Sequence, residues 1–391
     1  MHNTTPPDLA TVPELNAPRS WRNWRAATTV EKPYSISEYA LYSDAWFTAD
    51  APDRGPYSIL NALPHTTHSG GANEWKPALV LRVSHHLPGE MPDMTLTSSN
   101  HYHGGWLHDE VAALLSLELG LRIIAGPAVR EFDPHQDPFG RPRTQAAGLL
   151  PTLPPRAGPP QIPGLFVTRQ IDEVKLFDML PVFSAAAATA LIKSARSYQQ
   201  ALWIADSTPE TAWLLLVSAI EIAAGFWDSD RMTAVEKLEH SKPGLVAILR
   251  ENSDNELVAK VAKELHPLIG STGKFISFCT TFKPQPPEIR PAIERFDFAN
   301  RPYKKALSKI YDHRSKALHD GIPFPAPMCQ PPQHYKLEEP PLERPGGLGA
   351  ASHGASWVEE DFPMHLHLFA HIVRGALLNW WRSLSPGAAK V

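Results

Sequence analysis

Arg314 and His319 are the two side chains in this sequence whose types and spacing best fit acid–base chemistry on a phosphodiester. A histidine that titrates near pH ~6.5 can take the proton from a ribose 2′-hydroxyl or give one to the leaving oxygen. A guanidinium can bind two phosphate oxygens and stabilise charge that develops on phosphorus. On a helix the two residues lie about 7.5 Å apart along the axis and about 140° around it. A long arginine can still reach the groove beside the histidine, so the pair predicts metal-independent RNA cleavage with both residues catalytic.

A helix over residues 302–319 must position these two side chains, and the sequence has the signals that such a helix needs. Asn300 is a suitable N-cap, Pro302 suits the first turn, and Gly321 suits the stop. One face is expected to pack inward because apolar residues fall near helical spacing, namely Tyr303, Leu307, Ile310, Ala317 and Leu318.

The same helix is basic although the chain as a whole is acidic. Residues 301–321 hold six lysines and arginines against Asp312 and Asp320, a net charge of +4, whereas the chain carries −4. A local excess of this kind is typical of a surface that faces phosphates. We therefore predict RNA contacts for four lysines of this helix, Lys304, Lys305, Lys309 and Lys316.

Residue types alone also allow a structural interpretation of the pair. Arg314 would then be a surface or ion-pairing residue, and His319 would interact with the dipole at the helix end. The wider sequence favours the functional interpretation, through the motif around the pair and the helices upstream of it.

The motif Tyr311-x-x-Arg314-Ser315-Lys316-x-Leu318-His319-x-Gly321 resembles the signature of the Apea-like HEPN domains (higher eukaryotes and prokaryotes nucleotide-binding). An upstream helix pair is also similar, because residues 198–202 precede a strongly apolar helix that carries Glu221. The similarity covers residues 175–385. The sequence departs from the pattern where Asp320 separates the histidine from Gly321, and where serine follows Arg314.

This resemblance implies a bundle of four to five helices that often forms a homodimer. Active members of the family are metal-independent ribonucleases in which two motifs meet across the dimer cleft, so Arg314 and His319 would be the catalytic residues, with no cofactor and no metal. Ser315 would support them, and Glu221 would pair with Arg314 or orient it. A buried carboxylate satisfied by another donor is the alternative for Glu221.

Two functions of different classes follow from these observations. The first is a HEPN-like ribonuclease, or an RNA-directed effector of defence or stress response, whose N-terminal part senses or targets. The second is a non-catalytic HEPN-like module for dimerisation or RNA binding. A toxin-like protein restrained by a partner is a variant of the first.

Hydrophobic periodicity predicts an α+β N-terminal domain followed by an all-α bundle. Strands are expected at 77–83 and 121–125, and helices at 109–119, 185–205, 211–226, 231–250, 254–265, 302–319 and 362–383. Prolines, 40 of them, cluster between these segments. The predicted division is an irregular N-terminus (1–29), a small α+β domain (30–150), a Pro-rich linker (151–164) and a helical domain (165–385) with a Pro/Gly-rich loop (323–349).

Composition excludes several classes of protein. A net charge of −4 argues against a broadly basic nucleic-acid binder, and two cysteines are too few for a disulfide scaffold or a four-cysteine zinc site. The longest apolar stretch, 211–227, contains Glu221, so we expect a core helix and no membrane partner. The start of the chain lacks the order of a signal peptide, which favours the cytoplasm.

Other motifs predict less. The sequence has no phosphate-binding P-loop, dinucleotide fingerprint or nucleophile elbow. Residues 270–274 (GSTGK) are expected to form a polar turn. Histidine-rich segments at 101–110 and 365–371 lack a matched set of metal ligands, so we expect polar loops in the first and a half-exposed helix face in the second.

Overall fold

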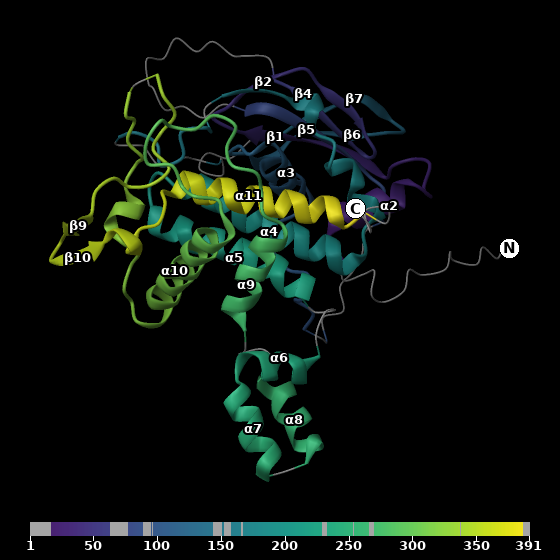
Figure 1. The fold of residues 1–391 in the computed structure, drawn as a ribbon. Coiled ribbons are helices and arrows are strands. Elements are labelled where there is room, and N and C mark those ends of the chain that lie inside the picture. Colours follow the sequence, from purple (N-terminus) through teal and green to yellow (C-terminus); the bar gives the residue numbers. More distant parts are fainter. Residues whose placement is uncertain are drawn as a thin grey trace.

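The computed structural model describes residues 17–62, 77–88, 95, 97–143, 151, 158–165, 167–228, 233–252, 254–265, 270–336 and 338–385. A β-sheet from the N-terminal half lies over layers of helices, most of which come from the C-terminal half (Figure 1). This arrangement confirms the prediction of an α+β region followed by a mainly helical one.

The sheet has six antiparallel strands in the order β3-β4-β5-β1-β6-β7. They are β1 (Ser35–Tyr42), β3 (Ala51–Arg54), β4 (Tyr57–Asn61), β5 (Pro77–His85), β6 (Ile124–Asp133) and β7 (Asp137–Pro142). In β5, alternate residues Leu79, Leu81 and Val83 are fully buried, as expected for a strand with one face on a core. The strand predicted at 77–83 is confirmed, whereas the one predicted at 121–125 begins only at Ile124.

Helix α3 (Leu107–Leu119) packs between this sheet and the C-terminal helices, and almost all of its residues are buried. Gly120 ends it with a φ of 70°, the left-handed conformation that a helix-terminating glycine adopts readily. A second N-terminal helix, α2 (Arg19–Ala27), inserts Trp21 and Trp24 into the same core. The prediction of an irregular segment over 1–29 is therefore wrong for Arg19–Ala27, where the two buried tryptophans stabilise a short amphipathic helix. Residues 1–16 lie outside the described part.

The main helices of the C-terminal half are α4 (Ala185–Ile204), α5 (Pro209–Asp228), α9 (Ser271–Thr281), α10 (Asn300–His319) and α11 (Leu366–Ser383). Four of them match predicted helices. Helix α9 was not predicted, and the polar turn expected at 270–274 is wrong: Gly270 has a φ of 80° and precedes a helix whose Phe275, Phe278 and Cys279 are buried.

The remaining elements of the main body are short. They are β2 (Trp46–Thr48), β8 (Thr168–Gln170), β9 (Gly349–Ser352), β10 (Ala355–Val358), and the 3₁₀ helices η1 (Ile171–Glu173), η2 (Phe177–Val182), η4 (Ala326–Cys329) and η5 (Glu359–Asp361). The Pro/Gly-rich segment predicted as a loop at 323–349 contains η4 and buries Phe324 and Met328. It is a packed loop.

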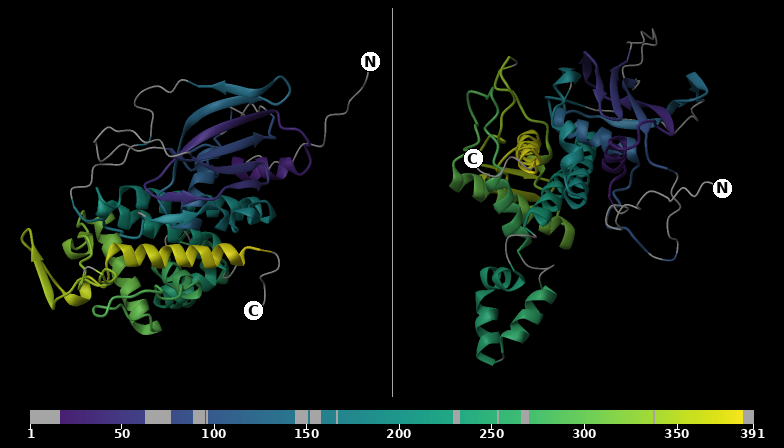
Figure 2. Two further views of the ribbon diagram at one scale, coloured as in Figure 1. Left: turned by 90° about the horizontal axis from the view of Figure 1, so that it is seen from above. Right: turned by 90° about the vertical axis from the view of Figure 1, so that its right-hand side faces the viewer.

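Three helices form a separate unit between α5 and α9: α6 (Ala234–Ser241), α7 (Pro243–Asn252) and α8 (Asn255–Leu265). The unit has its own small core of Leu238, Val246, Val258 and Ala262, and it projects away from the main body (Figures 1 and 2). The single helix predicted over 231–250 is wrong in that α6 ends before Lys242, because Pro243 begins a new helix.

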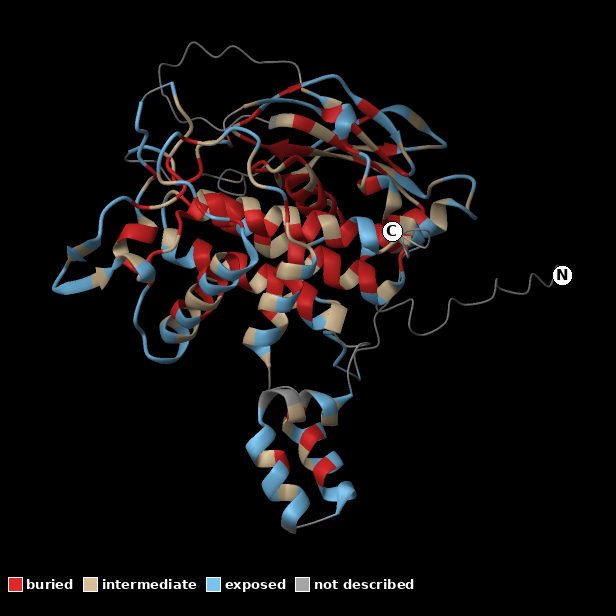
Figure 3. Ribbon diagram, viewed as in Figure 1, coloured by how far each residue is buried: buried red, intermediate tan, exposed pale blue. Residues whose placement is uncertain are grey.

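The two halves of the chain share one apolar core, which differs from the two separate domains that were predicted. Strand β2 pairs in parallel with β8. Buried apolar residues of both halves, the first of them Ala17 and the last Trp381, form one cluster of contacting side chains (Figure 3). In the segment predicted as a linker, Ile162 and Leu165 are buried in this core. Residues 158–165 therefore pack against the body of the protein.

Helix α5 is long and apolar enough, by length and composition, to cross a membrane, and it is the one such helix among the described residues. It buries Trp213, Leu216, Val217 and Ile220 in the core. As predicted, it packs as a core helix of the bundle.

Candidate functional site

Helix α10 carries the candidate site and lies at the edge of the bundle beside α5 and α9 (Figure 1). Its inward face buries Tyr303, Leu307 and Ile310 completely, as the spacing predicted. Leu318 was expected on that face but is 53% exposed, because the helix end extends beyond the core. The N-cap is Ala299 and not Asn300, whose side-chain oxygen instead accepts a hydrogen bond from Lys283 Nζ at 3.2 Å.

Glu221 of α5 binds two side chains of α10. Its Oε2 accepts a hydrogen bond from Arg314 Nη2 at 2.8 Å, and its Oε1 accepts one from the Tyr311 hydroxyl at 2.7 Å. The Arg314 guanidinium also lies 5.5 Å from the centre of the Tyr311 ring. The ion pair considered for Glu221 from the sequence is thus present, and it holds Arg314 against the bundle.

This cluster is only partly open to solvent. The side chains of Arg314 and Glu221 are 20% and 22% exposed, and Arg314 Nε is buried without a hydrogen-bond partner in the described part of the chain. Burial, together with the hydrogen bond to Glu221, raises the pKa of Tyr311 to about 12, so this tyrosine keeps its proton at neutral pH. The Glu221 carboxylate thus binds one neutral phenol, that of Tyr311, and one cation, the guanidinium of Arg314.

His319 is the last residue of α10 and is exposed. Neither ring nitrogen makes a hydrogen bond within the described residues. Because the helix turns about 140° between positions 314 and 319, the histidine belongs to the solvent face while Arg314 faces α5. Within one chain the structure does not bring the two predicted catalytic side chains together.

The predicted RNA-contacting lysines divide into two groups. Lys309 forms an ion pair with Asp361 at 3.0 Å, which lowers the pKa of that aspartate and offsets the lysine's charge. Lys304, Lys305 and Lys316 are exposed and have no acidic partner within ion-pairing distance among the described residues. Ser315, predicted as supporting, is half-buried one residue away from Arg314.

His313 was not singled out from the sequence, yet it is the buried histidine of α10. Its Nε2 lies 2.6 Å from the main-chain oxygen of Asp361, and burial lowers its pKa. Helical spacing from Ala306 and Ile310 places position 313 on the inward face, so periodicity was the signal that could have identified it.

The two histidine-rich segments contain buried groups. His103 Nε2 lies 2.8 Å from Glu110 Oε1, and both side chains are almost fully buried, which differs from the polar loop expected there. His365 is buried, whereas His367 and His371 are half-buried on α11. Throughout the described residues, no three histidine, cysteine or acidic side chains converge closely enough to hold a metal ion.

Comparisons of the chain with protein-family models, with curated proteins and with solved structures found no match. The HEPN resemblance rests on the α10 motif and on the preceding helix pair.

Proposed function

We propose that the protein is an RNA-directed, HEPN-like helical protein whose α10 binds single-stranded RNA through its solvent face. The observation that carries this proposal is the charge on that face. Of the six cations between residues 301 and 321, Lys309 and Arg314 are paired with acids, while the other four are exposed: Arg301, Lys304, Lys305 and Lys316. His319 lies among these four by helical position.

Electrostatics gives this face affinity for a phosphate backbone. Cations without acidic partners gain from displacing the counterions condensed on RNA, and this gain weakens as salt concentration rises. Asp312 lies on the same face, so the site has moderate positive charge. We expect weak, salt-sensitive binding in a cytoplasmic setting.

Binding of a fluorescent oligouridylate at increasing salt tests this proposal. Replacing Lys304 and Lys305 by alanine removes two phosphate contacts, so the slope of log affinity against log salt is expected to fall by about 1.4. Lys260 and Lys263 are exposed on α8, where Lys260 pairs with Glu256, and they provide the control: their replacement leaves the slope unchanged. Equal slopes for both double variants would contradict an α10 site.

Metal-independent ribonuclease activity is a second candidate, favoured by the exposure of His319, whose ring nitrogens have no hydrogen-bond partner among the described residues. Since Arg314 and His319 face different directions within one chain, cleavage requires Arg314 of one copy and His319 of another, that is, a homodimer. The resemblance to HEPN domains implies such a pairing.

Incubation with single-stranded RNA in a chelator tests this second candidate. Cleavage that persists in His135→Ala and is lost in His319→Ala supports it, because His135 is an exposed histidine far from α10. If the intact protein binds the RNA but does not cleave it, the result contradicts ribonuclease activity and favours the non-catalytic, RNA-binding function.

A further inference from the structure

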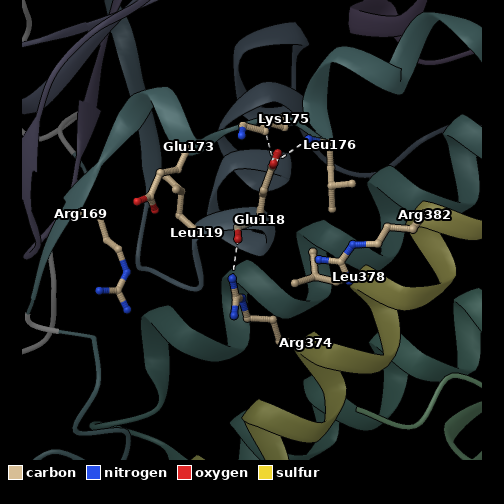
Figure 4. A pocket seen from close by; sticks show the side chains of 9 residues that line it. All are labelled: Glu118, Leu119, Arg169, Glu173, Lys175, Leu176, Arg374, Leu378 and Arg382. Carbon is tan, nitrogen blue, oxygen red and sulfur yellow. Dashed lines mark hydrogen bonds between the residues drawn. The ribbon is translucent and has the colours of Figure 1, made fainter. Parts of the chain in front are cut away.

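A cavity of about 420 Å³ lies where the end of α3, the segment that follows β8 and the helix α11 meet. None of its residues belongs to α10 or to the site described above, and Figure 4 shows them from close by. Its volume falls within the range of about 300–1,000 Å³ that is usual for small-molecule sites. Nine residues line it: Glu118, Leu119, Arg169, Glu173, Lys175, Leu176, Arg374, Leu378 and Arg382.

Four of these residues are cations, and they come from separate parts of the chain. Arg169 belongs to β8, Lys175 follows η1, and Arg374 and Arg382 lie two turns apart on α11. None of the four has an acidic partner within 4.0 Å among the described residues. Like charges gathered in this way repel one another, and an anion between them would relieve the repulsion.

The two acids in the cavity wall offset only half of this positive charge. Both carboxylate oxygens of Glu118 are occupied by main-chain donors: Oε1 accepts from Lys175 N and Leu176 N at 2.6 Å, and Oε2 accepts from Phe177 N at 2.9 Å. Glu173 is exposed. The lining therefore has a net charge of +2, and its half-buried acid, Glu118, is bound to the backbone (Figure 4).

Arg374 is the fixed element of the site. Its Nε donates to the Leu117 carbonyl oxygen at 3.0 Å and its Nη2 donates to the Glu118 carbonyl oxygen, so the guanidinium caps the C-terminus of α3. Its Nη1 makes no hydrogen bond to any described residue. A guanidinium held by two of its nitrogens can present the third to a ligand without a further loss of conformational freedom.

One wall of the cavity is apolar. Leu119 and Leu378 are buried and Leu176 is half-buried, and all three side chains line the space beside the arginines. A ligand that matches this surface has a compact apolar or ring-shaped part joined to a strongly anionic part. Guanidinium groups bind phosphate through two parallel N–H···O bonds, and a phosphate group carries more negative charge than a carboxylate to set against several cations.

We propose that this cavity binds a small phosphorylated molecule of the nucleotide class. Arg169, Arg374 and Arg382 contact its phosphate groups, and the leucine wall contacts its ring. The ligand joins the C-terminus of α3 to α11, and hence the sheet-bearing half of the protein to the helical half.

Isothermal titration calorimetry of the full chain with ADP, pyrophosphate and adenosine as probes tests this site. We expect ADP to bind, adenosine to bind at least tenfold more weakly, and Arg169→Ala and Arg382→Ala each to weaken ADP binding about tenfold, the effect of losing one charge-assisted hydrogen bond. Both arginines are exposed, so their variants should fold, which circular dichroism verifies. Arg141→Ala, at an 82% exposed arginine of β7, is the control and should bind ADP as the unaltered chain does.

Several results would overturn the proposal. These are no binding of ADP or pyrophosphate at millimolar concentration, equal binding of ADP and adenosine, or ADP binding that neither cavity variant changes. Oligouridylate binding that depends on Arg169 and Arg382, without binding of ADP, would assign the cavity to RNA instead. Binding of ADP is independent of α10, so its result does not depend on the RNA proposal.

Discussion

Glu221 is the residue on which the candidate site depends, because one carboxylate serves both Arg314 and Tyr311. Removing any member of this group leaves a partly buried polar atom without its partner. Such orphaned groups cost more than the net contribution of the bond itself. The cluster therefore fixes where α10 lies against α5, whatever further role Arg314 has.

A double-mutant cycle measures this coupling. Glu221→Ala and Arg314→Ala are each expected to lower the free energy of unfolding by about 1–3 kcal/mol, because each leaves a partner unsatisfied. The double variant is expected to lose about 0.5–1.5 kcal/mol less stability than the two single variants lose in sum. This coupling energy is modest because solvent partly screens the pair. Urea denaturation gives these values.

His319→Ala is the matched control for that cycle. The side chain is exposed and makes no hydrogen bond to the residues that the structure describes, so the change in unfolding free energy should stay within about 0.5 kcal/mol. Strictly additive losses in the Glu221 and Arg314 variants would mean that the two side chains do not interact in solution.

At the scale of elements, helix α11 approaches the Pro-rich segment between α9 and α10 very closely. A Cβ atom added at Gly375 would lie 2.4 Å from Pro284 Cβ, a distance that atoms cannot adopt. Gly225 on α5 has open space at the equivalent point, with no atom of the described part of the chain within 4 Å. The two glycines share a helical setting and differ only in what surrounds them.

Alanine substitutions at these two glycines should therefore have opposite effects. Gly225→Ala is expected to raise the free energy of unfolding by about 0.5–1 kcal/mol, because alanine is the better helix former. Gly375→Ala should lower it by about 1–3 kcal/mol, because α11 and the Pro284 loop must move apart. Thermal unfolding of the two variants provides the comparison, and stabilisation of both would show that α11 and the loop are not in contact.

The histidines at the start of α11 make that element sensitive to acid. Burial lowers the pKa of His365 to about 4 and that of His367 to about 3, and His365, followed by His371 and His334, adds to the effect on His367. The Nδ1 atoms of both residues are buried without a partner in the described structure. Both rings are therefore neutral in the folded protein at neutral pH.

Stability should fall as the pH is lowered from about 6.5. Below that pH the unfolded chain binds protons at these histidines and the folded chain does not, which favours unfolding by about 1.4 kcal/mol per pH unit for each histidine. His367→Asn should make the plot of unfolding free energy against pH less steep between pH 6.5 and 5. His135→Asn, at an exposed site, should leave the slope unchanged, and equal slopes for both variants would contradict the assignment.

At the scale of the whole molecule, a buried arginine joins the two halves. Arg122 donates to Asp44 Oδ2 at 2.8 Å, to Asp206 Oδ2 at 2.7 Å and to the Leu202 carbonyl oxygen at 2.7 Å. Trp21 of the N-terminal half donates to the Phe183 carbonyl oxygen at 3.0 Å. These contacts lie within the shared core, so neither half can bury its apolar surface alone.

The two halves should accordingly unfold in one cooperative transition. Residues 1–164 and 165–391, expressed separately, are expected to lack a cooperative thermal transition and to bind a hydrophobic dye, because each exposes its side of the core. A full chain in which a Gly/Ser linker replaces residues 233–265 should retain the transition, since the three-helix unit has a core of its own. Cooperative unfolding of either separate half would show that it is an independent domain.

Local features of the fold were largely predictable from the sequence. The periodicity of Tyr303, Leu307 and Ile310 indicated the inward face of α10, and the apolar run around Trp213 indicated a core helix. Such signals are local, because a helix repeats every 3.6 residues and its buried face shows in the order of the residues. Helix α9 was missed since its polar start resembles a turn and only the packing of Phe275 and Phe278 reveals it.

The sequence by itself therefore determined the order of an α+β region and a helical one, the basic character of α10 and the spacing of Arg314 and His319. The tertiary structure alone decided that the two halves share a core, that Arg314 binds Glu221 while His319 faces solvent, and that four cations from distant segments meet in one cavity. The physical reason is that these features depend on which surfaces of different helices and strands pack against one another and so exclude water. Residues far apart in the chain make those contacts, so the pattern of neighbouring residues in the sequence cannot predict them.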